Sequence, residues 1–278
     1  MTRTIILAIV VAAIASAVVA TVMLLHTTSV GHVKELHVLC GAGLMKPVNE
    51  LIKEFENETG IKVVVDYGGS GEILAKLELG EGDVFIPGAY YYMEIALRKH
   101  LVVPTTVKNV TLHIPVIAVP SGNPGHVHGL RDLLRPGIRI ALGDPRACAI
   151  GRVALKLFKK NGLWNLYEEK LKRGEIVFAP TVNQLLIYVV TRQVDAAIVW
   201  EDMVTWAQAK GRIEIIEIPP SQNIIKTIPA AVTVFAEKHG VYREALEFVK
   251  FITSPQGIKV WEKWGFKPWN ASTLHVGR

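Results

Sequence analysis

Hydrophobic positions along this chain follow two patterns that alternate from residue 36 onward. Short apolar runs rich in β-branched residues predict strands, and segments with apolar residues three and four apart predict amphipathic helices. Such alternation is typical of an α/β protein with mostly parallel sheets and a ligand site at the strands' carboxyl ends. We expect strands at 36–39, 61–67, 83–87, 114–120, 138–142, 176–179, 194–199 and 227–235. We expect helices that begin near Pro47 and after Gly71, and others at about 90–99, 152–160, 182–192, 202–210, 242–253 and 255–264.

The N-terminus has a different pattern, because residues 5–25 carry no charge and follow Arg3. About 20 apolar residues are enough to span a bilayer, and a preceding arginine favours a cytoplasmic N-terminus with the remainder exported. We therefore expect an N-terminal hydrophobic helix within residues 1–32, acting as a membrane anchor or as a signal segment. Ala15-Ser-Ala17 resembles a signal-peptidase site, so both alternatives stay open.

Four of the predicted strands end in a turn of small residues or proline that leads straight into a helix. The turns are 40–47, 67–71, 143–151 and 178–182. Each helix start leaves backbone N–H groups unpaired, with the positive end of the helix dipole behind them. Glycine and alanine let a ligand approach those amides closely. Four such turns facing one cleft would form a site for an anion.

Composition and charge exclude several other classes of protein. The formal net charge is +6, but lysine and arginine are scattered and not interleaved with aromatic residues, so we expect no nucleic-acid partner. The nine histidines lack metal-ligand spacing, and no catalytic triad or carboxylate pair is evident, so we expect no metal, no cofactor and no enzyme activity. Cys148 near Arg152 leaves open a thiol enzyme acting on an anionic substrate, against the simpler interpretation of a buried apolar cysteine.

Several short motifs, in their order and spacing, give the chain a family resemblance. They are Gly41-Ala-Gly-Leu44, Tyr67-Gly-Gly-Ser-Gly-Glu-Ile-Leu74, Asp83-Val-Phe-Ile86, Gly143-Asp-Pro145 with Gly151, Asp195-Ala-Ala-Ile-Val-Trp200, and Thr253-Ser-Pro-Gln-Gly257 with Gly265-Phe266. With these motifs, residues 36–268 resemble the substrate-binding proteins of ABC importers, most closely the molybdate- and tungstate-binding branch. The resemblance implies the type II periplasmic-binding-protein fold, with two α/β lobes that close on a ligand. We expect lobe I at 33–116 and 230–278 and lobe II at 117–229.

The same resemblance implies an anion site of neutral donors from both lobes. Its expected ligand-binding residues are Gly43, Leu44, Ser70, Ile150, Val182 and Trp200. Gly43 falls where the family usually has a serine, so only backbone amides donate there, and Trp200 takes the place of a tyrosine. Ser70 matches a family serine, although capping the following helix is its alternative role. The carboxylates of Glu201 and Asp202 are expected to be solvated at a helix start, and whether either enters the site stays open.

These observations predict an extracytoplasmic, monomeric solute-binding protein that delivers molybdate or tungstate to ABC permease subunits without catalysis. Sulfate, phosphate or another anion on the same scaffold is the alternative ligand. A protonated phosphate would need an acceptor carboxylate in the site, whereas a fully ionised dianion would not. We expect Cys40 and Cys148 to stay reduced beside the anion site; a redox latch between the lobes is the competing possibility.

Overall fold

The computed structural model describes residues 35–269. The expected N-terminal helix at residues 5–25 lies outside this range. Within the described range, no helix combines the length and the apolar composition needed to cross a bilayer.

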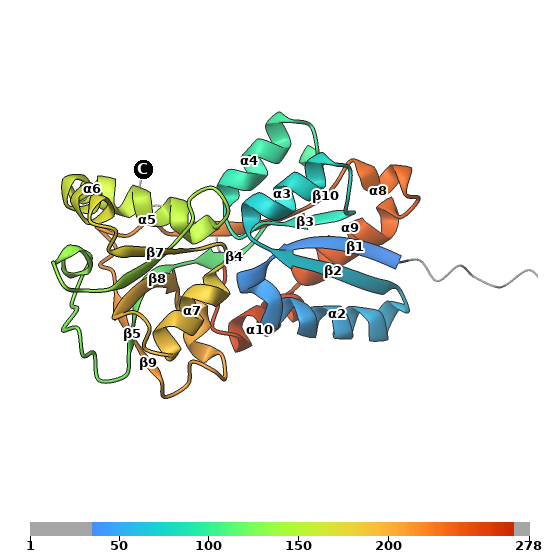
Figure 1. The fold of residues 1–278 in the computed structure, drawn as a ribbon. Helices are drawn as coiled ribbons and strands as arrows, with labels where there is room; N and C mark the ends of the chain where they lie inside the picture. Colours follow the sequence, from blue (N-terminus) through green and yellow to red (C-terminus); the bar gives the residue numbers. More distant parts are fainter. Residues whose placement is uncertain (1–34, 270–278) are drawn as a thin grey trace, which may run out of the picture. The chain divides into compact units, whose positions relative to one another are not determined.

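Two five-stranded sheets organise the described residues, one in each half of the ribbon (Figure 1). The first sheet has the order β2-β1-β3-β10-β4, with β1 at Glu35–Gly41, β2 at Lys62–Gly68, β3 at Val84–Ile86, β4 at Lys108–His113 and β10 at Lys226–Val232. The second has the order β7-β6-β8-β5-β9, with β5 at Pro115–Pro120, β6 at Ile140–Gly143, β7 at Ile176–Ala179, β8 at Ala196–Trp200 and β9 at Ile213–Glu217. We call the parts built on them the first half and the second half.

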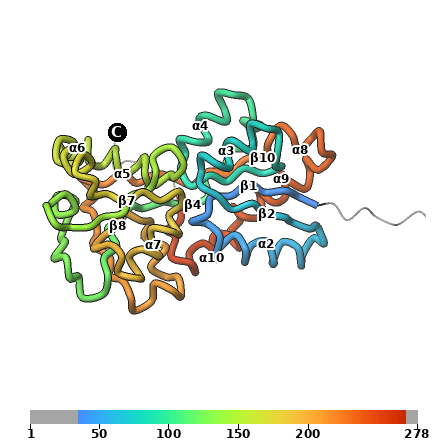
Figure 2. Tube along the Cα trace, viewed as in Figure 1, coloured from blue at the N-terminus to red at the C-terminus, as the bar shows by residue number. Residues whose placement is uncertain are grey.

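Helices cover the faces of both sheets. Those of the first half are α2 (Met45–Thr59), α3 (Ser70–Glu78), α4 (Tyr90–Arg98), α8 (Phe235–Lys238), α9 (Tyr242–Ile252) and α10 (Pro255–Lys263). Those of the second half are α5 (Ala149–Lys160), α6 (Trp164–Lys172) and α7 (Val182–Val190). The Cα trace shows that α9 and α10, late in the sequence, lie beside α2 from its beginning (Figure 2).

The sheets are mixed, so the expectation of mostly parallel sheets was wrong. β1 runs parallel to β2 and β3, and β6 runs parallel to β7 and β8, as predicted. β10, however, is antiparallel to both β3 and β4, and β5 is antiparallel to both β8 and β9. A helix returns the chain before each parallel strand, whereas the chain crosses into β5 and β10 from the other sheet without such a helix. These two strands therefore run against their neighbours.

The apolar pattern predicted most elements to within a few residues, and α2 illustrates why. Its stripe of Val48, Leu51 and Phe55 is buried, and Phe55 packs edge-on against Phe248 of α9 at a centroid distance of 5.1 Å. The helix ends where expected, at Gly60, which adopts the left-handed conformation with φ of 71°. β4, β9, α6 and α8 were not predicted.

The predicted helix at 202–210 was wrong. A 3-10 helix occupies Glu201–Thr205, and irregular turns follow it. Here the N–H of Trp206 donates to the carbonyl of Met203 at 3.2 Å, and the N–H of Ala209 donates to that of Trp206 at 2.9 Å. These bonds span three residues, which is tighter than the four of an α-helix, and they bring Met203, Trp206 and Ala209 into the core together.

Candidate functional site

The four predicted turns meet at one small cavity between the two halves, with a volume of about 20 Å³. It forms there because the turns follow β1, β2, β6 and β7, whose carboxyl ends face the opposite half. Its lining residues are Gly41, Ala42, Gly43, Leu44, Gly68, Gly69, Ser70, Gly88, His113, Cys148, Ala149, Thr181, Val182 and Trp200. We call this the small cavity.

Five of the six predicted site residues line the small cavity: Gly43, Leu44, Ser70, Val182 and Trp200. Ile150 does not, and Cys148 and Ala149 take its place in the lining. Because α5 begins at Ala149, earlier than the expected residue 152, the first helical position lies at the cavity and Ile150 is fully buried behind it. Contact of these residues with a ligand stays a prediction.

Ser70 is placed to donate a hydrogen bond into the small cavity. Its side chain is buried, and its Oγ accepts the N–H of Gly88 at 3.0 Å. It does not cap α3, whose N-cap is Gly69, with the Gly69 N–H donating to the Glu72 carboxylate at 3.3 Å. Since the hydroxyl oxygen already serves as an acceptor, its proton remains available for a ligand.

Thr181 offers a similar hydroxyl from the second half. It is the N-cap of α7, and its Oγ1 accepts the N–H of Gln184 at 3.4 Å. Its O–H is thereby left to donate into the small cavity, which Thr181 lines. We did not predict this residue. The pattern Thr181-Val-Asn-Gln184 is a capping-box motif that could have revealed it.

Trp200 and His113 form a stacked pair in the wall of the small cavity. Their ring centroids lie 3.6 Å apart with an interplanar angle of 17°. The Nδ1–H of His113 donates to the carbonyl of Gly88 at 2.8 Å, which fixes the imidazole beneath the indole. Within residues 35–269 the Trp200 indole N–H has no hydrogen-bond partner, so it is free to donate to a ligand. A lone histidine ahead of a predicted strand gave no signal of this role.

The two carboxylates that follow Trp200 do not line the small cavity. Asp202 is buried, with its Oδ1 3.6 Å from the Nε2 of His113, and burial raises the pKa of its carboxyl against the lowering effect of that histidine. Glu201 pairs with Lys267 at 3.0 Å. Both carboxylates lie in the first turn of a helix, as expected, but Asp202 is not solvated, because Glu201–Thr205 folds into the space between the halves.

Glycines on the first half allow the second half to approach closely. A Cβ at Gly69 would lie 2.6 Å from the carbonyl oxygen of Ala147 and 2.8 Å from that of Pro180. The N–H of Gly71 donates to the Ala147 carbonyl at 3.0 Å. At Gly43, a Cβ would lie 2.9 Å from the Cγ1 of Val182, so this valine occupies the space that a side chain at position 43 would need. We expected these glycines to let a ligand approach, and in the structure they also let the opposite half approach closely.

Both cysteines are free and buried. Burial raises the pKa of the Cys148 thiol to about 11, although backbone N–H groups of Ile150 and Gly151 partly oppose this. The thiol is therefore protonated near neutral pH, unlike an activated nucleophile. Contrary to our expectation, Cys40 does not line the small cavity. The alternation along β1 directs Cys40 with Val38 into the core under α2 and α9.

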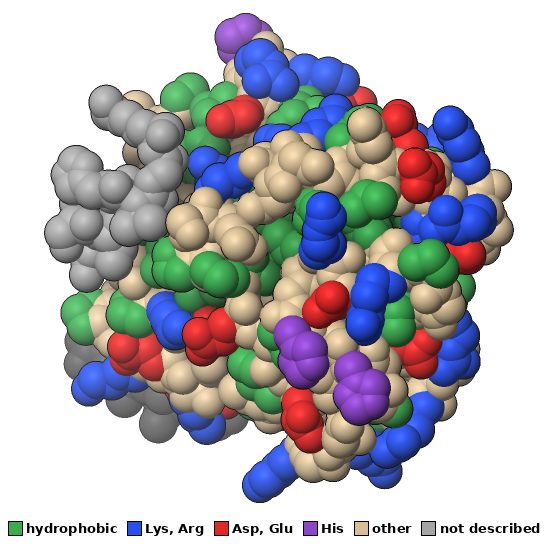
Figure 3. Space-filling model, turned by 90° about the vertical axis from the view of Figure 1, so that its left-hand side faces the viewer, with side chains coloured by type: hydrophobic (Ala, Val, Ile, Leu, Met, Phe, Trp, Pro, Cys, Tyr) green, Lys and Arg blue, Asp and Glu red, His purple; other side chains and the backbone are tan. Residues whose placement is uncertain are grey.

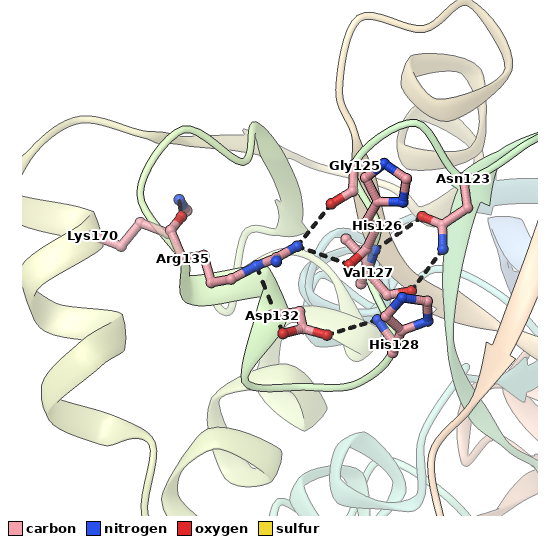
Figure 4. A network of polar contacts seen from close by, with 8 residues as sticks. All are labelled: Asn123, Gly125, His126, Val127, His128, Asp132, Arg135 and Lys170. Carbon is pink, nitrogen blue, oxygen red and sulfur yellow. Dashed lines mark hydrogen bonds and ion pairs between the residues drawn. The ribbon is translucent and has the colours of Figure 1, made fainter.

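The loop after β5 contains two histidines, and a polar network holds it in place (Figure 4). Arg135 donates to the carbonyls of Gly125 and His126 at 2.7 and 2.8 Å, and Asp132 accepts the backbone N–H of His128 at 2.8 Å. The buried Lys170 donates to the carbonyl of Arg135 at 3.0 Å. Nowhere in the described part of the chain do three or more potential metal-ligating side chains cluster.

Charge is distributed differently inside and outside the molecule. No lysine, arginine, aspartate or glutamate lines the small cavity. On the face of the second half, cationic and anionic side chains are interspersed (Figure 3). The small cavity therefore offers an anion only neutral donors: hydroxyls, an indole and the amides of helix starts.

The chain is similar in sequence to known solute-binding proteins. Residues 36–267 match the model of the bacterial extracellular solute-binding protein family. A relative from Haemophilus influenzae, named only in general terms as a binding protein, is 33% identical over 255 residues, covering 90% of this chain and 98% of the relative.

Solved structures share the fold. The periplasmic molybdate-binding protein of Azotobacter vinelandii is 21% identical, with a TM-score of 0.71, over 84% of this chain and 100% of that chain. The sulfate-binding protein SubI of Mycobacterium tuberculosis is 18% identical, with a TM-score of 0.72, over 86% of this chain and 88% of that chain.

Proposed function

Because the chain belongs to the bacterial extracellular solute-binding proteins, which are not enzymes, we propose that it captures a tetrahedral oxyanion for an ABC importer. The proposed ligand is molybdate or tungstate, and it binds in the small cavity. The proposed partner is the importer's permease, which receives the ligand at the extracytoplasmic face of the cell membrane.

The observation that carries this proposal is a cavity of about 20 Å³ lined mostly by buried residues and by uncharged donors. A single water needs roughly 10–15 Å³, and pockets for organic ligands have roughly 300–1,000 Å³. The small cavity therefore suits an ion of a few atoms. Helix starts, the hydroxyls of Ser70 and Thr181 and the indole of Trp200 supply hydrogen bonds to such an ion from both halves.

The absence of carboxylates from the lining favours a fully ionised dianion over phosphate. A protonated phosphate oxygen must donate its proton to an acceptor, and Glu201 and Asp202 lie outside the lining. Molybdate, tungstate and sulfate carry no such proton near neutral pH. Relatives of the same fold are named for binding molybdate and sulfate, which supports this class of ligand.

Closure of two lobes would deliver the ligand in a form that the permease recognises. We propose two lobes near the expected bounds of 33–116 with 230–278 and of 117–229. The chain crosses between the sheets from β4 to β5 and from β9 to β10, so these crossings lie a few residues before the expected bounds. Contacts such as Gly71 to Ala147, and the Asn183 amide donating to the Ala42 carbonyl at 3.2 Å, would form on closure. These bonds join protein to protein and do not require the ligand.

Calorimetric titration of the full chain with molybdate, tungstate, sulfate and phosphate at one pH tests the proposal. We expect molybdate or tungstate to bind most tightly and phosphate most weakly. Failure of all four anions to bind would refute oxyanion capture. Tighter binding of phosphate than of the three dianions would show that an acceptor carboxylate enters the site.

A protease-accessibility experiment tests the location. Protease added to intact cells should cut the folded part of the chain. Complete protection until the cells are lysed would refute export.

A further inference from the structure

A second, larger cavity lies in a groove between α4 of the first half and α5 of the second half. Its volume is about 360 Å³, within the range of pockets that bind organic molecules. It is lined by Ala89, Tyr90, Tyr91, Tyr92, Glu94, Asn109, Ala149, Arg152, Val153, Lys156, Ile224, Lys226 and Thr227. Ala149 is a wall residue of both cavities, but the function proposed above leaves this α4–α5 groove unused.

The charges in the α4–α5 groove favour an anion. Arg152, Lys156 and Lys226 line it against a single acid, Glu94. None of the three cations forms an ion pair with another residue of the described range. The Arg152 guanidinium instead lies over the ring of Tyr91, 3.8 Å from its centroid. A cation held on an aromatic face keeps its N–H groups free for an acceptor.

Two hydrogen-bond donors in the same lining have no partner. The side chain of Tyr92 is only 3% exposed, and neither its hydroxyl nor the Nε of Arg152 has a hydrogen-bond partner in the part of the chain that the structure describes. Buried polar groups are nearly always paired, because an unpaired group loses its bonds to water without replacement. Both residues line the groove, and these two donors reach an acceptor on a ligand when their buried side-chain atoms turn toward it.

We propose that the α4–α5 groove binds a small organic anion. Its carboxylate or phosphate oxygens accept from Arg152 and Tyr92, and its apolar body packs among the tyrosine rings at the start of α4. The small cavity is too small for such a molecule, so the two sites take different ligands. This inference goes beyond the proposed function and does not depend on it, because it rests on a different set of donors.

Calorimetry on the full chain with benzoate and phenyl phosphate tests the proposal, and benzyl alcohol serves as an uncharged probe of similar size. We expect at least one of the two anions to bind and benzyl alcohol to bind far more weakly. The carboxylate and phosphate probes distinguish the two acceptor groups. Each titration is run with and without tungstate. Binding of the probe in the absence of tungstate then tests the groove by itself, whether or not tungstate binds in the small cavity.

Matched variants locate the probe. Arg152→Gln should weaken its binding by roughly ten- to a hundredfold, as expected for a lost hydrogen bond between charged groups. Arg131→Gln, on an exposed arginine of the second half, makes the same substitution and should leave binding unchanged. Tyr92→Phe should weaken binding by about three- to tenfold. It should leave the melting temperature of the free protein unchanged or higher, because the hydroxyl it removes is unpaired.

Three results would overturn the proposal. The first is no binding of either anion at millimolar concentration. The second is binding that Arg152→Gln does not weaken. The third is loss of the probe in Ser70→Ala but not in Arg152→Gln, which would place the probe in the small cavity.

Discussion

The small cavity and the α4–α5 groove lie on either side of Ala149 and offer an anion opposite kinds of surroundings. The small cavity has no charged side chain in its lining, whereas the groove has three cations and one acid. Burying a charged group costs several kcal/mol unless it is fully paired, so an enclosed site is better built from hydroxyls, an indole and amides. In the wider groove, Lys156 and Lys226 stay exposed to water and avoid that cost. The size of a site therefore governs which donors it can use.

The largest effect is expected where the small cavity depends on close approach of the two halves. Gly69→Ala would place a Cβ against two backbone carbonyls, which cannot move aside as a flexible side chain can. We expect about a hundredfold weaker tungstate binding, as estimated from overpacking energies. Gly129→Ala is the matched control, since a Cβ at Gly129 has no neighbour within 4 Å. Equal tungstate affinities of the two variants would show that the halves need not approach this closely.

Ser70→Ala tests the neutral donors directly. It removes one donor to the anion and leaves the Gly88 N–H without its acceptor. Tungstate binding should weaken by roughly ten- to a hundredfold, because hydrogen bonds to charged partners are worth about 1.5–3 kcal/mol. Ser221→Ala, at an exposed turn position, should have no effect on the calorimetric affinity. An unchanged dissociation constant for every oxyanion would remove Ser70 from the site.

The contact between Gly43 and Val182 predicts a compensating pair of substitutions. Gly43→Ser introduces a side chain 2.9 Å from the Val182 methyl, so we expect roughly tenfold weaker tungstate binding from overpacking. Val182→Ala removes that methyl and should restore most of the affinity in the double variant. A double-mutant cycle of titrations measures the coupling. Additive losses would mean that the two positions do not compete for one space.

The smallest expected effect concerns salt, and it compares the two cavities most directly. Raising the ionic strength from about 0.05 to 0.5 M shortens the screening length severalfold. Benzoate in the groove should lose affinity by about two- to fivefold, since exposed cations attract it. Tungstate should change less, because its donors are neutral and enclosed. A larger salt effect on tungstate than on benzoate would show that charged groups matter more in the small cavity than in the groove.

Local sequence patterns were enough to predict the small cavity because each of its turns has its own signal. Glycines at 41, 43, 68 and 69 and the small residues before α5 mark strand–turn–helix junctions wherever the rest of the chain goes. His113 could not be predicted, since its role depends on stacking against Trp200 from the other sheet. The positions of β5 and β10 also depend on pairing across the whole fold.

The α4–α5 groove had no comparable signal. Tyr92, Arg152 and Lys226 come from α4, α5 and β10, and each alone resembles an ordinary core or surface residue. They lie close together only because the chain passes twice between the sheets, from β4 to β5 and from β9 to β10, and so brings the two halves into contact. Patterns along one element cannot predict such a meeting.

The position of Cys148 allows its rate of chemical labelling to report how often the two halves separate. It is one of two cysteines; it lines the small cavity, while Cys40 lies in the core. An alkylating reagent therefore reaches Cys148 when the halves separate, and the labelling rate measures how often they do. Because burial raises the pKa of this thiol to about 11, it stays protonated and unreactive in the closed arrangement, so that labelling proceeds only from the open form. A ligand that keeps the halves closed should slow the labelling, so occupancy can be followed in time without any engineered probe.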